Sequence, residues 1–150
     1  LTDTVTVVSD NNAALDSMKS TNFRPAVTAL LFEPPPFAVH PPDSSRIIWL
    51  YRGASHYQMD VFVDQPSCLV ISENYYPQGW RAYINGQRVK TWRTNVCLKS
   101  VFMQPGKHQV EFVYKPMSFV IGLWISAAGL LVLLIAAAAG GVSRIRKKNS

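Results

Sequence analysis

Hydrophobic and polar positions follow two different patterns along this chain. Up to residue 114, short apolar runs alternate with polar positions and are separated by turn-forming residues, which is typical of β-strands. The runs predicted as strands cover residues 4–8, 27–32, 46–51, 57–63, 68–75, 80–84, 87–92, 96–103 and 108–114. After residue 118 the pattern changes to one unbroken apolar stretch. The chain is therefore expected to combine a β-rich domain with one long helix.

Local signals interrupt the series of strands near the N-terminus. Residues 9–12 offer capping side chains, and residues 13–19 have the composition of a short helix. Prolines at 34–36 and 41–42 predict a stiff, extended loop. Many short strands with turns and little helix predict an antiparallel β-sandwich, jelly-roll-like, with a short N-terminal helix and one C-terminal transmembrane helix.

The dipeptide Asn-Gly at 85–86 predicts a hairpin between the strands before and after it. It is preferred in two-residue type I′ turns, so Ile84 is expected opposite Gln87. One face of this hairpin is apolar, and the other carries Arg81, Tyr83, Arg88, Lys90 and Trp92. Flat aromatic surface beside cationic donors suits a sugar ring, a phosphate-bearing lipid or the rim of a protein interface. This face is the best binding candidate, and an ordinary solvated sheet face is the alternative.

A second turn sequence, Pro-Gly at 105–106, suits the centre of a type II turn. It predicts a hairpin in which Val101 lies opposite Val110. One face of this hairpin is expected to be buried; it consists of Cys97, Val101, Met103, Val110, Phe112 and Tyr114. Because Leu98 and Phe102 fall on the opposite face, that face is expected to be covered in part as well.

Residues 119–142 read FVIGLWISAAGLLVLLIAAAAGGV and contain no ionisable side chain. A hydrocarbon core of ~30 Å needs about 20 helical residues, so this stretch predicts a transmembrane helix. Small side chains at Gly122, Ser126 and Gly129 would let a helix of an integral membrane partner approach closely. The alternative is that these residues reflect only the usual composition of spans.

Charge is distributed unevenly over the 150 residues, which carry a formal net charge of +6 and a pI near 9.6. Much of the excess lies in Arg144, Arg146, Lys147 and Lys148, and residues 1–118 are nearly neutral. The basicity is therefore no sign of nucleic-acid binding. Short cationic flanks stay in the cytoplasm and contact lipid headgroups, so the basic tail indicates how the chain is oriented in the membrane. We expect an extracytoplasmic domain at 1–118, a span at 119–142 and a cytoplasmic tail at 143–150, in a bacterial inner membrane.

Candidate chemistry is sparse. Cys68 and Cys97 are the only cysteines; an oxidising compartment permits a disulfide between them, and two free thiols are the alternative. The histidines His40, His56 and His108 have no metal-ligand spacing, and no nucleophile or phosphate-loop motif is present. The sequence therefore predicts no metal site, no cofactor and no catalytic residue.

Two segments resemble a known family. Residues 69–86, LVISENYYPQGWRAYING, and residues 105–116, PGKHQVEFVYKP, resemble the C-terminal region of YfhO-type bacterial membrane proteins, in which such strands precede the final span. That family is similar to multi-span glycosyltransferases that use lipid-linked sugars and whose catalytic acid lies in an early exterior loop. The resemblance implies that this chain corresponds to the exterior domain and last helix, so no catalytic residue carries over.

Two functions remain open at this point. The first is a non-catalytic, single-pass, membrane-anchored β-domain that acts by binding and assembly, as an accessory or scaffold subunit of a larger bacterial membrane complex. The second is the C-terminal fragment of a YfhO-type glycosyltransferase, which the start at Leu1 instead of Met favours. The expected partners are the lipid bilayer, an integral membrane protein and, as a candidate ligand, a glycan or lipid-linked sugar.

Overall fold

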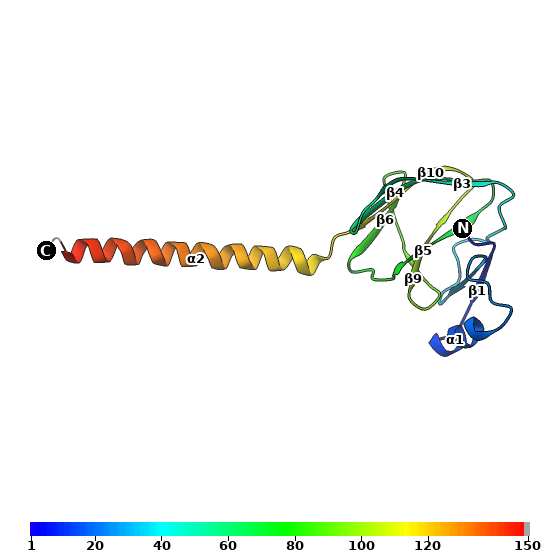
Figure 1. Ribbon diagram of the computed structural model, residues 1–150, viewed down its shortest axis with the longest axis horizontal. Coiled ribbons are helices and arrows are strands. Elements are labelled where there is room, and N and C mark those ends of the chain that lie inside the picture. The colour runs from blue at the N-terminus through cyan, green and yellow to red at the C-terminus, as the bar shows by residue number, and fades with distance from the viewer. Residues whose placement is uncertain (149–150) are drawn as a thin grey trace. The chain divides into compact units, whose positions relative to one another are not determined.

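The computed structural model describes the backbone of residues 1–148 and the side chains of residues 1–135. The chain divides into two units, Leu1–Lys115 and a second unit that begins at Pro116 (Figure 1). The first unit contains all the strands and one short helix, and the second contains one long helix. Each unit is described by itself.

The first unit is a β-sandwich of two five-stranded sheets (Figure 1). One sheet has the order β1-β2-β8-β9-β5 and the other β3-β4-β10-β6-β7. The pairing is antiparallel everywhere except between β1 and β2. The elements are β1 (Thr4–Val7), α1 (Asn11–Lys19), β2 (Thr28–Leu31), β3 (Ser45–Arg52), β4 (His56–Val63), β5 (Ser67–Asn74), β6 (Trp80–Ile84), β7 (Gln87–Val89), β8 (Trp92–Thr94), β9 (Leu98–Met103) and β10 (Gly106–Tyr114). The predicted fold class is confirmed.

The short helix α1 forms where the capping residues predict it. The Asp10 carboxylate accepts a hydrogen bond of 2.9 Å from the backbone N–H of Ala13 and so caps the first turn. Ala14 is the buried residue of the helix and packs in a small cluster with Val8 and Leu30. This contact fixes the helix on β2.

The Asn-Gly hairpin between β6 and β7 has the predicted register. Asn85 and Gly86 have φ values of 53° and 77°, as a type I′ turn requires, and Ile84 lies opposite Gln87. The Asn85 side chain also accepts a hydrogen bond of 2.9 Å from the backbone N–H of Gln109 on β10. The turn is therefore stabilised by this contact with β10 as well as by its own backbone conformation.

The prediction that β9 and β10 form a hairpin is wrong, because the two strands belong to different sheets. Val101 pairs with Leu69 on β5, and Val110 pairs with Met59 on β4 and with Ile84 on β6. Both strands do have one apolar face, but these faces meet across the core instead of lying side by side in one sheet. Four of the six residues expected on the buried face are buried, namely Val101, Met103, Val110 and Phe112, whereas Cys97 and Tyr114 are exposed.

The outer face of the β1-β2-β8-β9-β5 sheet is covered by the proline-rich loop that follows β2. Phe37 of this loop meets the ring of Phe102 edge-on at 5.8 Å between centroids, and Trp92 meets the same ring at 5.3 Å. Val39 packs against the same cluster. The expectation that Phe102 lies on a covered face is confirmed.

The second unit consists of α2 (Met117–Lys148). Its segment Met117–Ile135 is long and apolar enough to cross a membrane, and its side chains are largely exposed. Gly122 and Gly129 lie in this segment, and a Cβ at either position would meet no other atom within 4 Å. The four cationic side chains of the predicted tail lie outside the described side chains; they are Arg144, Arg146, Lys147 and Lys148.

Candidate functional site

A depression of about 420 Å³ beside the β6-β7 hairpin brings together three of the five residues predicted to form a binding face. Arg81 comes from β6, Arg88 from β7 and Lys90 from the segment after β7. The full lining is Tyr75, Pro77, Trp80, Arg81, Ala82, Arg88, Val89, Lys90 and Thr91. No acidic side chain lines this space, which we call the hairpin depression. Its charge therefore favours an anionic ligand.

Lys90 is held at the rim of the hairpin depression by two contacts. Its Nζ donates to the Glu33 carboxylate at 2.6 Å and lies 3.9 Å from the centroid of the Trp92 ring. About half of each ion-pair side chain is exposed, with 53% for Lys90 and 60% for Glu33. An exposed pair of this kind contributes only ~0–1 kcal/mol, so a ligand that carries more charge than one carboxylate can replace Glu33.

The other two residues of the predicted face lie elsewhere. Tyr83 is opposite Arg88 in the hairpin but does not line the hairpin depression. Trp92 was expected on the same strand as Arg88, yet β7 ends at Val89 and β8 begins at Trp92 in the opposite sheet. The chain changes sheets between the two strands, so the alternation of faces starts again and Trp92 is directed onto Phe102.

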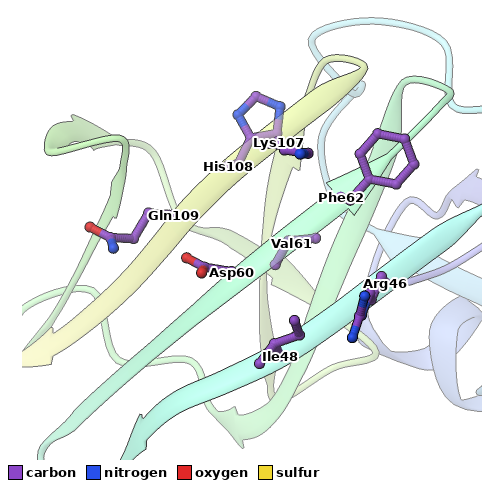
Figure 2. A pocket seen from close by; sticks show the side chains of 8 residues that line it. All are labelled: Arg46, Ile48, Asp60, Val61, Phe62, Lys107, His108 and Gln109. Carbon is purple, nitrogen blue, oxygen red and sulfur yellow. The ribbon is translucent and has the colours of Figure 1, made fainter.

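A second depression, of about 390 Å³, lies on the outer face of the strands β3, β4 and β10 (Figure 2). Its charged residues have both signs: Arg46 on β3, Asp60 on β4 and Lys107 on β10. Figure 2 shows them spread over the three strands, and Phe62 on β4 pairs with Arg46 on one side and with Lys107 on the other. This mixed lining gives no preference for one charge, and no sequence motif indicated it.

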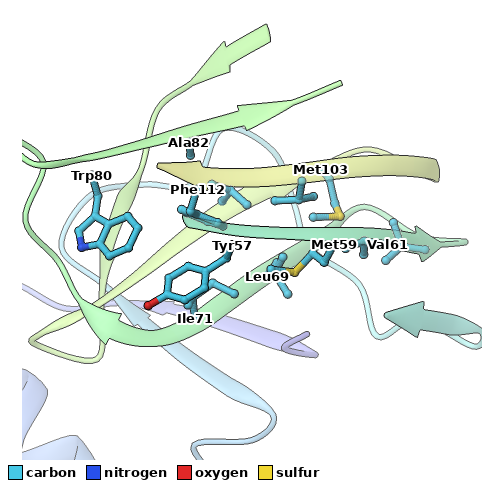
Figure 3. Packing of buried hydrophobic residues seen from close by; sticks show 12 residues of the cluster. Tyr57, Met59, Val61, Leu69, Ile71, Trp80, Ala82, Met103 and Phe112 are labelled. Atoms are coloured by element: carbon cyan, nitrogen blue, oxygen red, sulfur yellow. The ribbon is translucent and has the colours of Figure 1, made fainter. Parts of the chain in front are cut away.

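One buried ionisable residue belongs to no motif in the sequence. Lys99 on β9 is fully buried, and its Nζ has no hydrogen-bond partner. The nitrogen lies 3.2 Å from the Trp80 ring centroid and 5.4–5.5 Å from those of Phe112 and Tyr57. Figure 3 shows these three rings gathered at one end of the core. Burial lowers the Lys99 pKa to about 8, against the attraction of Glu73.

The sequence does contain a signal for this lysine. Lys99 is two residues before Val101 and four before Met103, so strand alternation places all three on one face. A single lysine in a strand ordinarily indicates a position exposed to solvent. Its burial becomes predictable only once the other residues on the same face of the strand are known to be buried.

The two cysteines are free thiols, and the strand register separates them. Cys68 is buried opposite Phe102, and Cys97 is exposed five residues earlier on the chain. At ~3.3 Å per residue their Cα atoms are roughly 16 Å apart, whereas a disulfide needs about 4.4–6.8 Å. The disulfide that the sequence left open is therefore not formed. Burial raises the pKa of the Cys68 thiol.

The histidines take part in separate local contacts. His56 Nε2 and the Glu111 carboxylate are 2.9 Å apart, and His108 Nε2 contacts the Gln104 carbonyl oxygen at 2.7 Å. In the described part of the chain, no three His, Cys, Asp or Glu side chains are grouped so that they could hold a metal ion.

Comparison with known proteins identifies the family. The model of the family described as bacterial membrane protein YfhO matches residues 51–126, which is just over half of the chain. No curated protein and no solved structure matches. The matched segment begins in β3, contains β4 to β10 and ends within α2. The chain therefore belongs to the YfhO family of bacterial membrane proteins.

Proposed function

We propose that the β-sandwich is a non-catalytic binding domain that α2 anchors in the membrane, and that it recognises an anionic headgroup as part of a larger bacterial membrane complex. The observation that carries this proposal is the hairpin depression, in which Arg81, Arg88 and Lys90 are the only charged side chains. A ligand with a phosphate would complement this charge.

Phosphate suits the two kinds of donor present. A guanidinium offers parallel N–H groups that match two phosphate oxygens, and the Lys90 ammonium acts as a point charge beside it. Arg88 is exposed and Arg81 half-buried, so only part of their hydration is lost on binding. Lipid-linked sugars carry a phosphate or diphosphate next to the sugar, and they are the ligand class we favour.

Features of the sequence support the orientation and the partners that we propose for the domain. We place residues 1–118 outside the cytoplasmic membrane and the basic tail inside, because short cationic flanks are retained in the cytoplasm. The small residues Gly122, Ser126 and Gly129 offer a surface on which a helix of another membrane protein can pack.

A second function is favoured by the extent of the family match. The match covers residues 51–126, from the end of β3 to α2, so it includes strands of both sheets and part of the helix. In a YfhO-type glycosyltransferase this segment would shape the access of a lipid-linked sugar to a catalytic site elsewhere. Ten or more spans encoded in frame upstream of Leu1 would support this function over an accessory subunit.

Binding is tested with the whole chain in phosphatidylcholine nanodiscs that contain a short-chain polyprenyl phosphate hexose. We expect slower hydrogen exchange in residues 80–92, and about tenfold weaker binding in Arg88→Ala, because a charge-assisted hydrogen bond contributes ~1.5–3 kcal/mol. Polyprenyl phosphate without sugar and inorganic phosphate, added separately, show which part of the ligand is recognised.

Two exposed lysines are compared, and Lys107 is the matched control for Lys90. Lys90 lines the hairpin depression and Lys107 the depression with charges of both signs. Lys90→Ala is expected to weaken binding, whereas Lys107→Ala is expected to leave it unchanged. Equal losses in the two variants would mean that general attraction between cations and lipid accounts for binding, and the proposed site would be abandoned.

A further inference from the structure

A third space lies where the two sheets end on the same side of the sandwich. β3 and β5 are the last strands of their sheets, and residues of β3, β4 and β5 line a pocket of about 200 Å³ between them. The lining residues are Trp49, Arg52, Tyr57, Val70, Ile71, Ser72 and Glu73. We call this space the edge pocket.

Trp49 supplies a flat apolar wall of the edge pocket. It pairs with Met59, which is fully buried, so the strand register directs Trp49 to the core side of its sheet. The facing sheet ends at β5, and Trp49 therefore remains 45% exposed although its position faces inward. Its ring meets the Tyr57 ring edge-on at 6.4 Å between centroids.

Polar groups of both charges stand beside this wall. Burial and the neighbouring Glu73 carboxylate raise the pKa of the Tyr57 hydroxyl, and the Arg52 guanidinium lies 5.3 Å from the Trp49 ring centroid. The ion pairs of the described residues do not include Arg52 with Glu73. The Glu73 carboxylate lone pairs and the Arg52 N–H groups are therefore not used by each other and can bind a ligand. Their charges cancel, which disfavours a ligand with net charge.

A buried cation lies behind the floor of the edge pocket. Ile71, which lines the pocket, pairs with Lys99 on β9, and the Lys99 Nζ lies 5.5 Å from the centroid of the Tyr57 ring. The Lys99 ammonium has no hydrogen-bond partner and is attracted by the Glu73 charge. The Tyr57 hydroxyl and the Lys99 ammonium therefore both feel the charge of the Glu73 carboxylate, which lines this pocket.

We propose that the edge pocket binds one ring of an uncharged saccharide. The C–H face of a sugar ring packs on a flat aromatic surface such as Trp49, while its hydroxyls donate to a carboxylate and accept from a guanidinium. The volume is below the ~300–1,000 Å³ of pockets for drug-sized ligands, so it fits a single ring. The site shares no lining residue with the hairpin depression and does not depend on the function proposed for it.

The test uses the whole chain in phosphatidylcholine nanodiscs, because sugar-based detergents would compete. The probes are the methyl glycosides of glucose, galactose and N-acetylglucosamine at millimolar concentrations, followed by saturation-transfer difference NMR. We expect transfer to the ring C–H protons of at least one glycoside. Trp49→Ala should abolish it, and Glu73→Gln, which keeps the shape of the side chain, should weaken binding about tenfold.

Ile48→Ala is the matched control, because Ile48 is the neighbour of Trp49 on β3, is similarly exposed at 43%, and lines a different depression. This variant should bind like the unaltered chain. Absence of transfer from all three glycosides, or transfer that persists in both Trp49→Ala and Glu73→Gln, would overturn the proposal. Binding of the phosphate-bearing lipid at the hairpin depression should be unaffected by either variant, so the two proposals fail separately.

Discussion

The buried ammonium of Lys99 should destabilise the sandwich near neutral pH, and this cost should disappear in alkaline solution. The pKa of Lys99 is about 8 in the folded chain, against 10.5 for an unperturbed lysine. Below about pH 8 both states are protonated, and the folded state bears the whole cost of the buried charge. Between about pH 8 and 10.5 the unfolded state binds more protons at this residue, so the contribution of Lys99 to the free energy of unfolding rises with pH.

The size of this effect on the free energy of unfolding follows from the shift in the Lys99 pKa. At 1.36 kcal/mol per pKa unit, a shift from 10.5 to about 8 corresponds to roughly 3 kcal/mol. Replacing Lys99 by Met, which has a similar unbranched shape, removes this cost. It also removes the contact with the Trp80 ring, 3.2 Å away, which contributes about 1–2 kcal/mol at a desolvated site. We therefore expect Lys99→Met to stabilise the sandwich by about 1–3 kcal/mol near neutral pH.

The assay is urea unfolding of the nanodisc-embedded chain, followed by near-ultraviolet circular dichroism at about pH 7 and pH 10. Lys99→Met should have the higher midpoint at the lower pH and should lose the part of the pH dependence that Lys99 causes. Lys107→Met, which replaces an exposed lysine, is the control and should keep it. A lower midpoint for Lys99→Met near neutral pH, with the pH dependence unchanged, would refute the assigned cost of the buried charge.

Three further predictions concern separate parts of the sandwich. Cys97 should react quickly with iodoacetamide in the folded chain and Cys68 only after unfolding, and a disulfide-linked peptide in mass spectrometry would contradict the register of β5 and β9. Gly86→Ala should lower the free energy of unfolding by about 1–2 kcal/mol through its φ of 77° alone, since a Cβ there meets no atom; an unchanged urea midpoint would argue against the type I′ turn. Phe37→Ala should cost about 1–3 kcal/mol, measured in the same way, and no change would mean that the loop does not cover Phe102.

The strands themselves were predictable because their signals are local. Alternation of apolar and polar residues marks β4 and β10, and the Asn-Gly turn at 85–86 fixes the β6-β7 register within a few residues. Such patterns depend only on neighbours along the chain, so the strands that they predict do not depend on how the sheets are assembled.

Partners between strands were less predictable, because they depend on distant residues. The Pro-Gly at 105–106 fits a hairpin as well as the change of sheet that the structure has, and only the pairing of Val110 with both β4 and β6 decides between them. The edge pocket was not predictable for a similar reason. Trp49 is exposed there because the facing sheet ends at β5, and no local sequence pattern indicates where a sheet ends.

The place of β10 in the fold has a consequence for how the protein is made. β10 lies between β4 and β6 and is also the last strand of the sandwich along the chain. During synthesis both neighbours therefore remain without their shared partner until residues 106–114 leave the ribosome. At about 5–20 residues per second, the 32 residues of α2 follow within ~2–6 s. The strand that completes the core and the helix that enters the membrane are thus synthesised within the same few seconds, so the two sheets cannot close before the anchor is nearly complete.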